Sequence, residues 1–208
     1  MTLLMILFSS FIIAFSGAMM PGPLLTVTIS ESSRRGFKAG PMLILGHGIL
    51  EALLIVALLF GLASVLSKEW AFIVISFTGG IILLFMAIDM FRSLPKLSLS
   101  FEVDSARKQH LVLSGIMMSI INPYWIVWWA TLGLGLILQS KTHGVPGVAC
   151  FFTGHILGDL VWYSVIAFAV DRGRKLLTDK RYRTLIGLCA GFLLIFAGYF
   201  FVSAFKRL

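Results

Sequence analysis

Two prolines flanking a glycine, Pro21-Gly22-Pro23, interrupt an uncharged stretch that covers residues 2–29. A proline donates no backbone hydrogen bond, and its ring clashes with the preceding helical turn. We therefore expect this triplet to break a helix rather than to bend it gently. Lipid cannot satisfy the polar groups that a break exposes, so a break at membrane depth has to be buried in protein or to line a wet cavity.

The composition places the chain in a membrane. Of its 208 residues, 59% are hydrophobic and only 12% are charged, and the mean hydropathy is +0.99. A soluble domain needs a more polar surface, so an integral membrane protein in contact with lipid is predicted. The net charge of +8 does not indicate nucleic acid, because the basic residues lie in a few short loops. Six apolar runs are each long enough to cross a bilayer: 2–29, 39–67, 70–88, 111–140, 145–170 and 184–205.

The basic residues are divided unevenly between the two sets of loops. Thirteen of the 17 Lys and Arg residues follow the first, third and fifth runs, and cytoplasmic loops are the ones enriched in such residues. We predict a multi-pass protein of the plasma (inner) membrane with both termini outside. The fourth run, 111–140, is too long for one upright helix. Asn122-Pro123 supplies a break near its middle.

The two halves of the chain resemble each other. The sequence SGAMM at 16–20 precedes the first break, and SGIMM at 114–118 precedes the second. Runs two and five each contain Gly-His with an acidic residue four positions after the His. Three runs in each half make the second half cross the membrane in the opposite sense, as in the inverted repeats of many transporters. We predict an all-α integral membrane protein with six transmembrane helices in two inverted three-helix repeats, of which spans one and four are broken at Pro. The repeats are 1–92 and 111–208, and a polar linker at 93–110 joins them.

Four ionisable residues lie inside apolar runs: His47 and Glu51 in the second, and His155 and Asp159 in the fifth. The spacing of four places each pair on one helical face. An ionisable group at bilayer depth costs about 2.5–3.5 kcal/mol, so it normally faces a cavity or a partner. Burial disfavours a charged carboxylate, which brings proton uptake and release within reach of neutral pH. We assign the four residues to proton coupling. The alternative is a pair of structural His–acid contacts that tie helices together.

The breaks are the predicted substrate site. Broken helices form the substrate sites of many secondary transporters, because helix N-termini attract anionic groups and exposed carbonyls attract cations. Aromatic side chains beside a break can hold an ammonium group, although such a cluster is also typical of ordinary packing. The arrangement suits a zwitterionic or cationic small molecule. The candidate substrate-binding residues are Pro21, Gly22, Pro23, Asn122, Pro123, Tyr124 and Trp125.

Other functions are weighed against transport of such a metabolite. Two His and two carboxylates that met at the centre would also suit export of a divalent metal ion. A membrane scaffold without transport is a further alternative. The chain has no nucleophile–base pair, redox pair or cofactor motif, so neither an enzyme nor a cofactor is predicted, and Cys150 and Cys189 are interpreted as packing residues. Small-residue faces with the spacing Gly-x-x-x-Gly, at 154–158 and 187–191, indicate close helix packing, and a homo-oligomer is a candidate assembly.

These residues together resemble the LysE/RhtB family of amino-acid exporters, over nearly the full length of the chain. The resemblance rests on Pro21-Gly22-Pro23, the linker after the third span, Asn122-Pro123, and Gly158-Asp159 with Trp162. It implies export of amino acids or related metabolites, driven by the proton motive force, with the two breaks and Asp159 in the transport site. Many members carry Lys or His after the Asn-Pro, where this chain has Tyr124. The resemblance therefore does not imply a particular amino acid as substrate.

Overall fold

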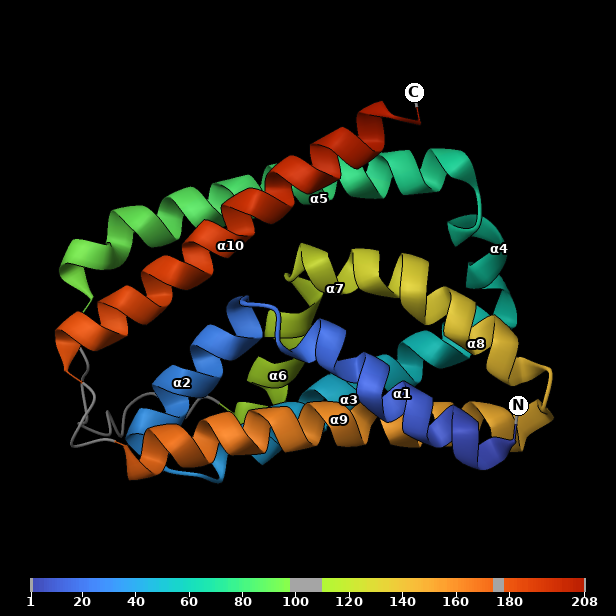
Figure 1. Cartoon of the computed structure of the whole chain (residues 1–208), viewed down its shortest axis with the longest axis horizontal. Coiled ribbons are helices and arrows are strands. Elements are labelled where there is room, and N and C mark those ends of the chain that lie inside the picture. The colour runs from blue at the N-terminus through green and yellow to red at the C-terminus, as the bar shows by residue number, and fades with distance from the viewer. Residues whose placement is uncertain (1, 98–109, 174–177, 208) are drawn as a thin grey trace.

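The computed structural model describes residues 2–97, 110–173 and 178–207. These residues form helices joined by short turns, and they contain no strand. Most of the predicted linker at 93–110 lies outside the described residues. Figure 1 shows the helices lying roughly side by side, with α5 and α10 forming a pair along one edge.

The first break has the form that its prolines require. Helix α1 (Leu3–Ala18) ends before the triplet, and α2 (Pro23–Arg35) begins at the second proline after a bend of 83°. Gly22 caps α2 in an extended conformation, and Pro23 occupies the first helical position, where a missing N–H costs nothing. The predicted interruption of the first span is confirmed.

The second break lies between α6 (Leu111–Ile120) and α7 (Pro123–Trp128), where the chain bends by 65°. The Asn122 side chain accepts a hydrogen bond from the backbone N–H of Tyr124 at 3.2 Å, which caps α7. A π-helical turn, η3 (Trp129–Gly133), then leads into α8 (Leu134–Lys141).

The remaining spans are continuous or gently kinked. Four are long and apolar enough to cross a membrane, and the total is six if each bent pair is counted as one span. The predicted six spans agree with this higher count. In the second span, the π-helical turn η1 contains Gly61 at φ 123°, a backbone conformation that favours glycine. The elements are α3 (Ala39–Ala57), η1 (Leu58–Leu62), α4 (Ala63–Leu66), α5 (Glu69–Ser93), η2 (Leu94–Lys96), α9 (Gly144–Arg172) and α10 (Asp179–Phe205).

Helices from opposite halves pair with each other. Helix α1 packs along α9, α3 along α6, and α5 along α10 (Figure 1). Glycines permit the first two of these contacts. A Cβ at Gly46 would overlap the carbonyl oxygen of Val112, and a Cβ at Gly154 would overlap that of Leu7. The Gly-His sequence of each half therefore packs against the first half-helix of the other half.

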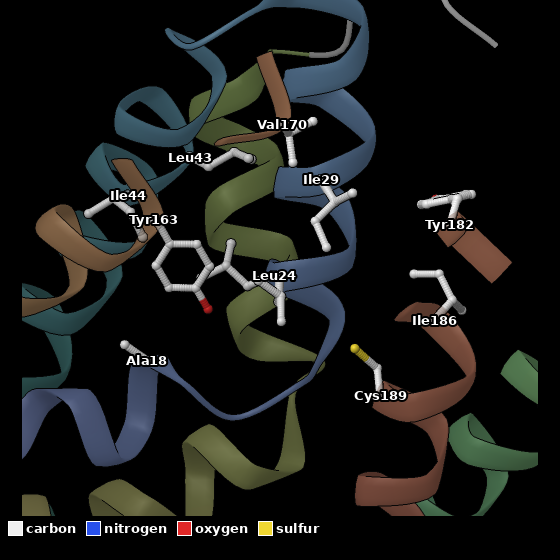
Figure 2. Close-up of a cluster of buried hydrophobic side chains, with 11 residues drawn as sticks. Ala18, Leu24, Ile29, Leu43, Ile44, Tyr163, Val170, Tyr182, Ile186 and Cys189 are labelled. Atoms are coloured by element: carbon white, nitrogen blue, oxygen red, sulfur yellow. The ribbon is translucent and has the colours of Figure 1, made fainter. Parts of the chain in front are cut away.

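Burial in the structure fits a lipid environment. Large apolar side chains are exposed on the outer faces, for example Phe60 at 89% and Phe85 at 70%. Figure 2 shows one internal cluster, in which side chains from α2, including Ile29, pack with others from α3, α9 and α10. This cluster fixes the second half of the broken first span against the rest of the molecule.

Candidate functional site

The structure brings the four predicted ionisable residues into one buried cluster. Helices α3 and α9 face each other, so each His lies near both carboxylates. His47 Nε2 lies 3.0 Å from Glu51 Oε1 and 3.5 Å from Asp159 Oδ2. His155 Nε2 lies 3.2 Å from Glu51 Oε2 and 3.5 Å from Asp159 Oδ2. The exposed fractions of Glu51 and Asp159 are only 1% and 3%.

Two tryptophans hold Glu51 from the opposite side. The indole N–H of Trp125 donates to Glu51 Oε1 at 3.0 Å, and that of Trp129 donates to the same oxygen at 2.9 Å. The two residues are four positions apart across α7 and η3, so one helical face presents both donors. The carboxylate of Glu51 is thereby fixed by the segment that directly follows the second break.

A hydrogen-bond chain extends from the cluster to α6. The Ser119 hydroxyl donates to the carbonyl of Gly115 at 2.7 Å, so it is free to accept from His47 Nδ1, which lies 2.6 Å away. With Nδ1 acting as a donor, a hydrogen bond between His47 Nε2 and Glu51 Oε1 needs a further proton, carried by one of these two atoms. The two side chains are therefore placed to exchange a proton.

Some polar atoms of the cluster have no partner. Glu51 Oε2, Asp159 Oδ2 and His155 Nδ1 are buried and make no hydrogen bond to any described residue. The ring of His155 is held instead by stacking, between Trp128 at 4.7 Å and Phe151 at 5.9 Å from centroid to centroid. Buried polar atoms without a hydrogen bond are uncommon. The two carboxylate oxygens have only imidazole nitrogens at 3.2–3.5 Å beside them, so a cationic group could compete for both.

The cavity at this site is small. Its volume is about 30 Å³, which has room for a water molecule or two and not for an amino acid. The cavity is lined by Gly17, Ala18, Leu24, His47, Glu51, Ser119, Asn122, Tyr124, Trp125, Trp128, His155, Asp159 and Tyr163.

The predicted break residues divide into two groups. Asn122, Tyr124 and Trp125 line the cavity, whereas Pro21, Gly22, Pro23 and Pro123 do not. A Cβ at Gly22 would lie 3.2 Å from Asn122 Nδ2, so the two breaks lie next to each other. The prolines therefore shape the site without contacting its interior.

A known protein family matches almost the whole chain. The pattern of the LysE type translocator family matches residues 15–204, which include both breaks and all four ionisable residues. The chain belongs to the LysE type translocator family. It is therefore a multi-pass membrane transporter and not an enzyme. Family membership decides against the scaffold alternative.

Two curated relatives of this LysE type translocator cover almost all of it. One is named "Putative amino acid efflux protein YcgF", from Bacillus subtilis (strain 168), and it is 24% identical over 90% of both chains. The other is named "Chemotactic transduction protein ChpE", from Pseudomonas aeruginosa PAO1, and it is 26% identical over 94% of this chain and 97% of its own length. No solved structure matches the chain.

Several residues of the translocator's site were not predicted. Trp128, Trp129 and Ser119 all contact the cluster, whereas only Tyr124 and Trp125, the two aromatic residues next to the break, were predicted to line the site. The helical spacing of the tryptophans allows one face to hold all three, so closeness to the break in sequence was the less informative signal. Nothing in the local sequence around Ser119 marks it as a partner of a His 72 positions away.

Removal of the Asn122 cap tests the second break. Asn122→Ala deletes the acceptor for the Tyr124 N–H, and we expect it to lower the free energy of unfolding by about 1 kcal/mol and to reduce transport, because the segment that carries Trp125 loses its anchor. Thr2→Ala is the matched control. It removes a similar cap from the exposed start of α1, so transport should be preserved. Thermal unfolding in detergent and flux in proteoliposomes measure the two effects, and equal transport in both variants would contradict the expectation.

Proposed function

We propose that this LysE type translocator exports amino acids or related small zwitterionic or cationic metabolites across the plasma membrane, in exchange for protons. The observation that carries the proposal is the pair of buried carboxylate oxygens, Glu51 Oε2 and Asp159 Oδ2, which make no hydrogen bond among the described residues and lie 3.2–3.5 Å from imidazole nitrogens. An ammonium group carries the charge and the hydrogen atoms to compete with these imidazoles for the two oxygens. The efflux named for the Bacillus subtilis relative supports this direction and class of cargo.

Proton coupling follows from competition for the same atoms. A proton on Asp159 Oδ2 removes the acceptor to which a substrate ammonium would bind, so the carboxylate binds either a proton or the substrate. His47 and His155, both within 3.5 Å of this oxygen, provide nearby sites for the proton when substrate is bound. High external proton concentration would displace substrate on the outer side, and lower proton concentration inside would permit loading.

The central cavity has to enlarge during transport. A volume of about 30 Å³ is too small for an amino acid, so the substrate cannot occupy it in this conformation. Transport then requires the two breaks to separate on one side of the membrane at a time. Broken helices suit this movement, because a break can change its angle without disrupting continuous helical hydrogen bonds.

Proteoliposomes test the proposal. Vesicles containing the protein are loaded with a mixture of radiolabelled L-amino acids, and the outside is acidified. We expect release of label to be at least tenfold faster with the pH gradient than without it, the ratio that a modest coupling of about 1.4 kcal/mol gives. Asp159→Asn should abolish the acceleration. Asp89→Asn, the same change at an exposed position of α5, should preserve it. Release that is indifferent to the gradient and unchanged in Asp159→Asn would contradict proton coupling.

A divalent metal ion is the second candidate cargo. Ligand atoms of His47, Glu51 and Asp159 all lie within 4.8 Å of one another, a geometry that could hold such an ion. The indole N–H groups occupy Glu51 Oε1, so a metal ion would have to bind this residue through Oε2. Binding of Mn²⁺ or Zn²⁺ to purified protein, together with metal flux and no amino-acid flux, would favour this alternative.

A further inference from the structure

A second cavity lies beside the central one, between α5, α7 and α10. We refer to it as the C-terminal cavity, and Phe72, Ser76, Tyr124, Trp128, Ser203 and Arg207 are among the residues that line it. Its volume is about 470 Å³, which falls in the range of sites for small molecules, about 300–1,000 Å³. In the conformation described here, this cavity is large enough for an amino acid and the central cavity is not.

The C-terminal cavity carries a group suited to a carboxylate. The guanidinium of Arg207 lies 4.0 Å from the centroid of the Phe72 ring, so a positive charge is held at the end of α10. Arg207 is exposed, whereas Ser76 in α5 is completely buried and is not accessible from the cavity in this conformation. The guanidinium of Arg207 is therefore the group of this cavity that can bind a small anionic group.

Tyr124 and Trp128 form the wall between the two cavities, since both residues line both of them. Ser16, near the end of α1, holds the two side chains in place. The Tyr124 hydroxyl donates to the Ser16 carbonyl at 3.0 Å, and the Trp128 indole N–H donates to the Ser16 hydroxyl at 3.0 Å. One residue of the first broken span therefore fastens two residues that follow the second break.

The wall is also part of the central cluster. Trp128 stacks on the ring of His155, so displacement of Trp128 would open the wall and release a face of His155 in the same movement. Tyr124 is held less tightly, with an edge-to-face contact to Phe196 on α10 at 5.4 Å. The two wall residues thus connect the ionisable cluster to the helices that form the C-terminal cavity.

We propose that the C-terminal cavity is a second binding site for the substrate, where Arg207 receives the carboxylate, and that Tyr124 and Trp128, fastened to Ser16, are the gate between this site and the central one. The identity of the ligand as an amino acid rests on the proposed function. The existence of an aqueous, anion-attracting cavity and of the gate rests on the geometry alone.

Labelling of a single cysteine tests the cavity without any substrate. In protein with Cys150→Ala and Cys189→Ala, Ser203→Cys places a thiol in the cavity, and two water-soluble methanethiosulfonates, one sulfonated and one quaternary ammonium, serve as probes. We expect the anionic reagent to react several-fold faster than the cationic one, and Arg207→Ala to remove the difference. Ser67→Cys, exposed at the end of α4, shows the intrinsic ratio of the two reagents. A thiol at Ser203 that reacts with neither reagent would mean that lipid fills the cavity, and the proposal would be overturned.

The gate is tested by a thiol in the central cavity. A thiol at Ser119→Cys, or at Ala18→Cys as a second reporter, should react slowly with the methanethiosulfonates. Ser16→Ala removes the acceptor of Trp128 and keeps the carbonyl that binds Tyr124. Loss of one hydrogen bond corresponds to about a fivefold change in an equilibrium, so we expect Ser16→Ala to accelerate labelling at both central positions about fivefold and to leave the rate at Ser203→Cys unchanged. Equal central rates with and without Ser16→Ala would overturn the gate.

Protection of the thiol at Ser203→Cys by amino acids distinguishes a failure of this proposal from a failure of the proposed function. A mixture of L-amino acids should slow anionic labelling of Ser203→Cys, and the methyl esters of the same amino acids, which lack the carboxylate, should not. Absence of protection in protein that transports amino acids would overturn the second site. Absence of both protection and flux, with charge-selective labelling intact, would overturn amino-acid export and leave the anion-attracting cavity established.

Discussion

Glu51→Gln should reduce proton-driven transport by at least about 30-fold, the factor that corresponds to the loss of one charge-assisted hydrogen bond of about 2 kcal/mol. Glu51 is 1% exposed and lies within 3.3 Å of four nitrogen atoms, two from indoles and two from imidazoles. An amide in its place carries no charge and directs an N–H group toward some of these nitrogens. Glutamine also lacks the ionisable group that can exchange a proton with His47.

The matched control for this change is Glu69→Gln. Glu69 is exposed in the first turn of α5, so the same exchange of carboxylate for amide should change flux by less than twofold. Initial rates of amino-acid release from proteoliposomes under an imposed pH gradient provide the measurement. A Glu51→Gln protein that transports as fast as Glu69→Gln would show that the buried carboxylate serves only in packing.

Alanine at Gly46 or at Gly154 should destabilise the protein by about 1–3 kcal/mol, because extra volume in a close-packed interface forces neighbouring groups apart. In both positions the new Cβ meets a backbone carbonyl of a paired helix, that of Val112 or that of Leu7, and backbone cannot swing away as a flexible side chain does. The two losses should be similar, because each glycine precedes a His of the cluster and makes the equivalent contact in its half of the chain. Thermal unfolding in detergent measures both.

We expect Gly191→Ala to have the opposite effect and to stabilise the protein. A Cβ at Gly191 would have no atom within 4 Å, so this substitution should stabilise α10 by about 0.5–1 kcal/mol through helix propensity alone. Within the chain, no described residue packs closely on Gly191, whereas the face at 154–158 packs tightly against α1. Equal effects of alanine at Gly154 and Gly191 would contradict the structure.

Local sequence was sufficient to predict the broken helices and the His–acid pairs. Pro23 and Pro123 remove backbone donors wherever they stand, so both breaks follow from covalent chemistry. The i,i+4 spacing likewise determines that His47 reaches Glu51, as it does at 3.0 Å. These features depend only on residues within one or two turns of each other. The inverted repeat and the outward termini remain predictions.

Contacts between residues that are far apart in the sequence could not be predicted from local patterns. His155 and Glu51 are 104 positions apart, and Trp129 and Glu51 are 78 apart. The contact between His155 and Glu51 depends on the packing of α9 against α3, which is set by the fit of helix surfaces rather than by any motif. Pro21 and Pro23 do not line the cavity, since their rings direct the chain and leave the lining to other residues.

The pairing of α5 with α10 constrains how such a protein can change between a conformation open to one side of the membrane and a conformation open to the other. These helices are the last spans of the two halves, and they pack along each other while forming one side of the C-terminal cavity. Because the two helices share an extensive interface, we expect them to move together in any conformational change, so that a change in one half of the chain is transmitted to the other.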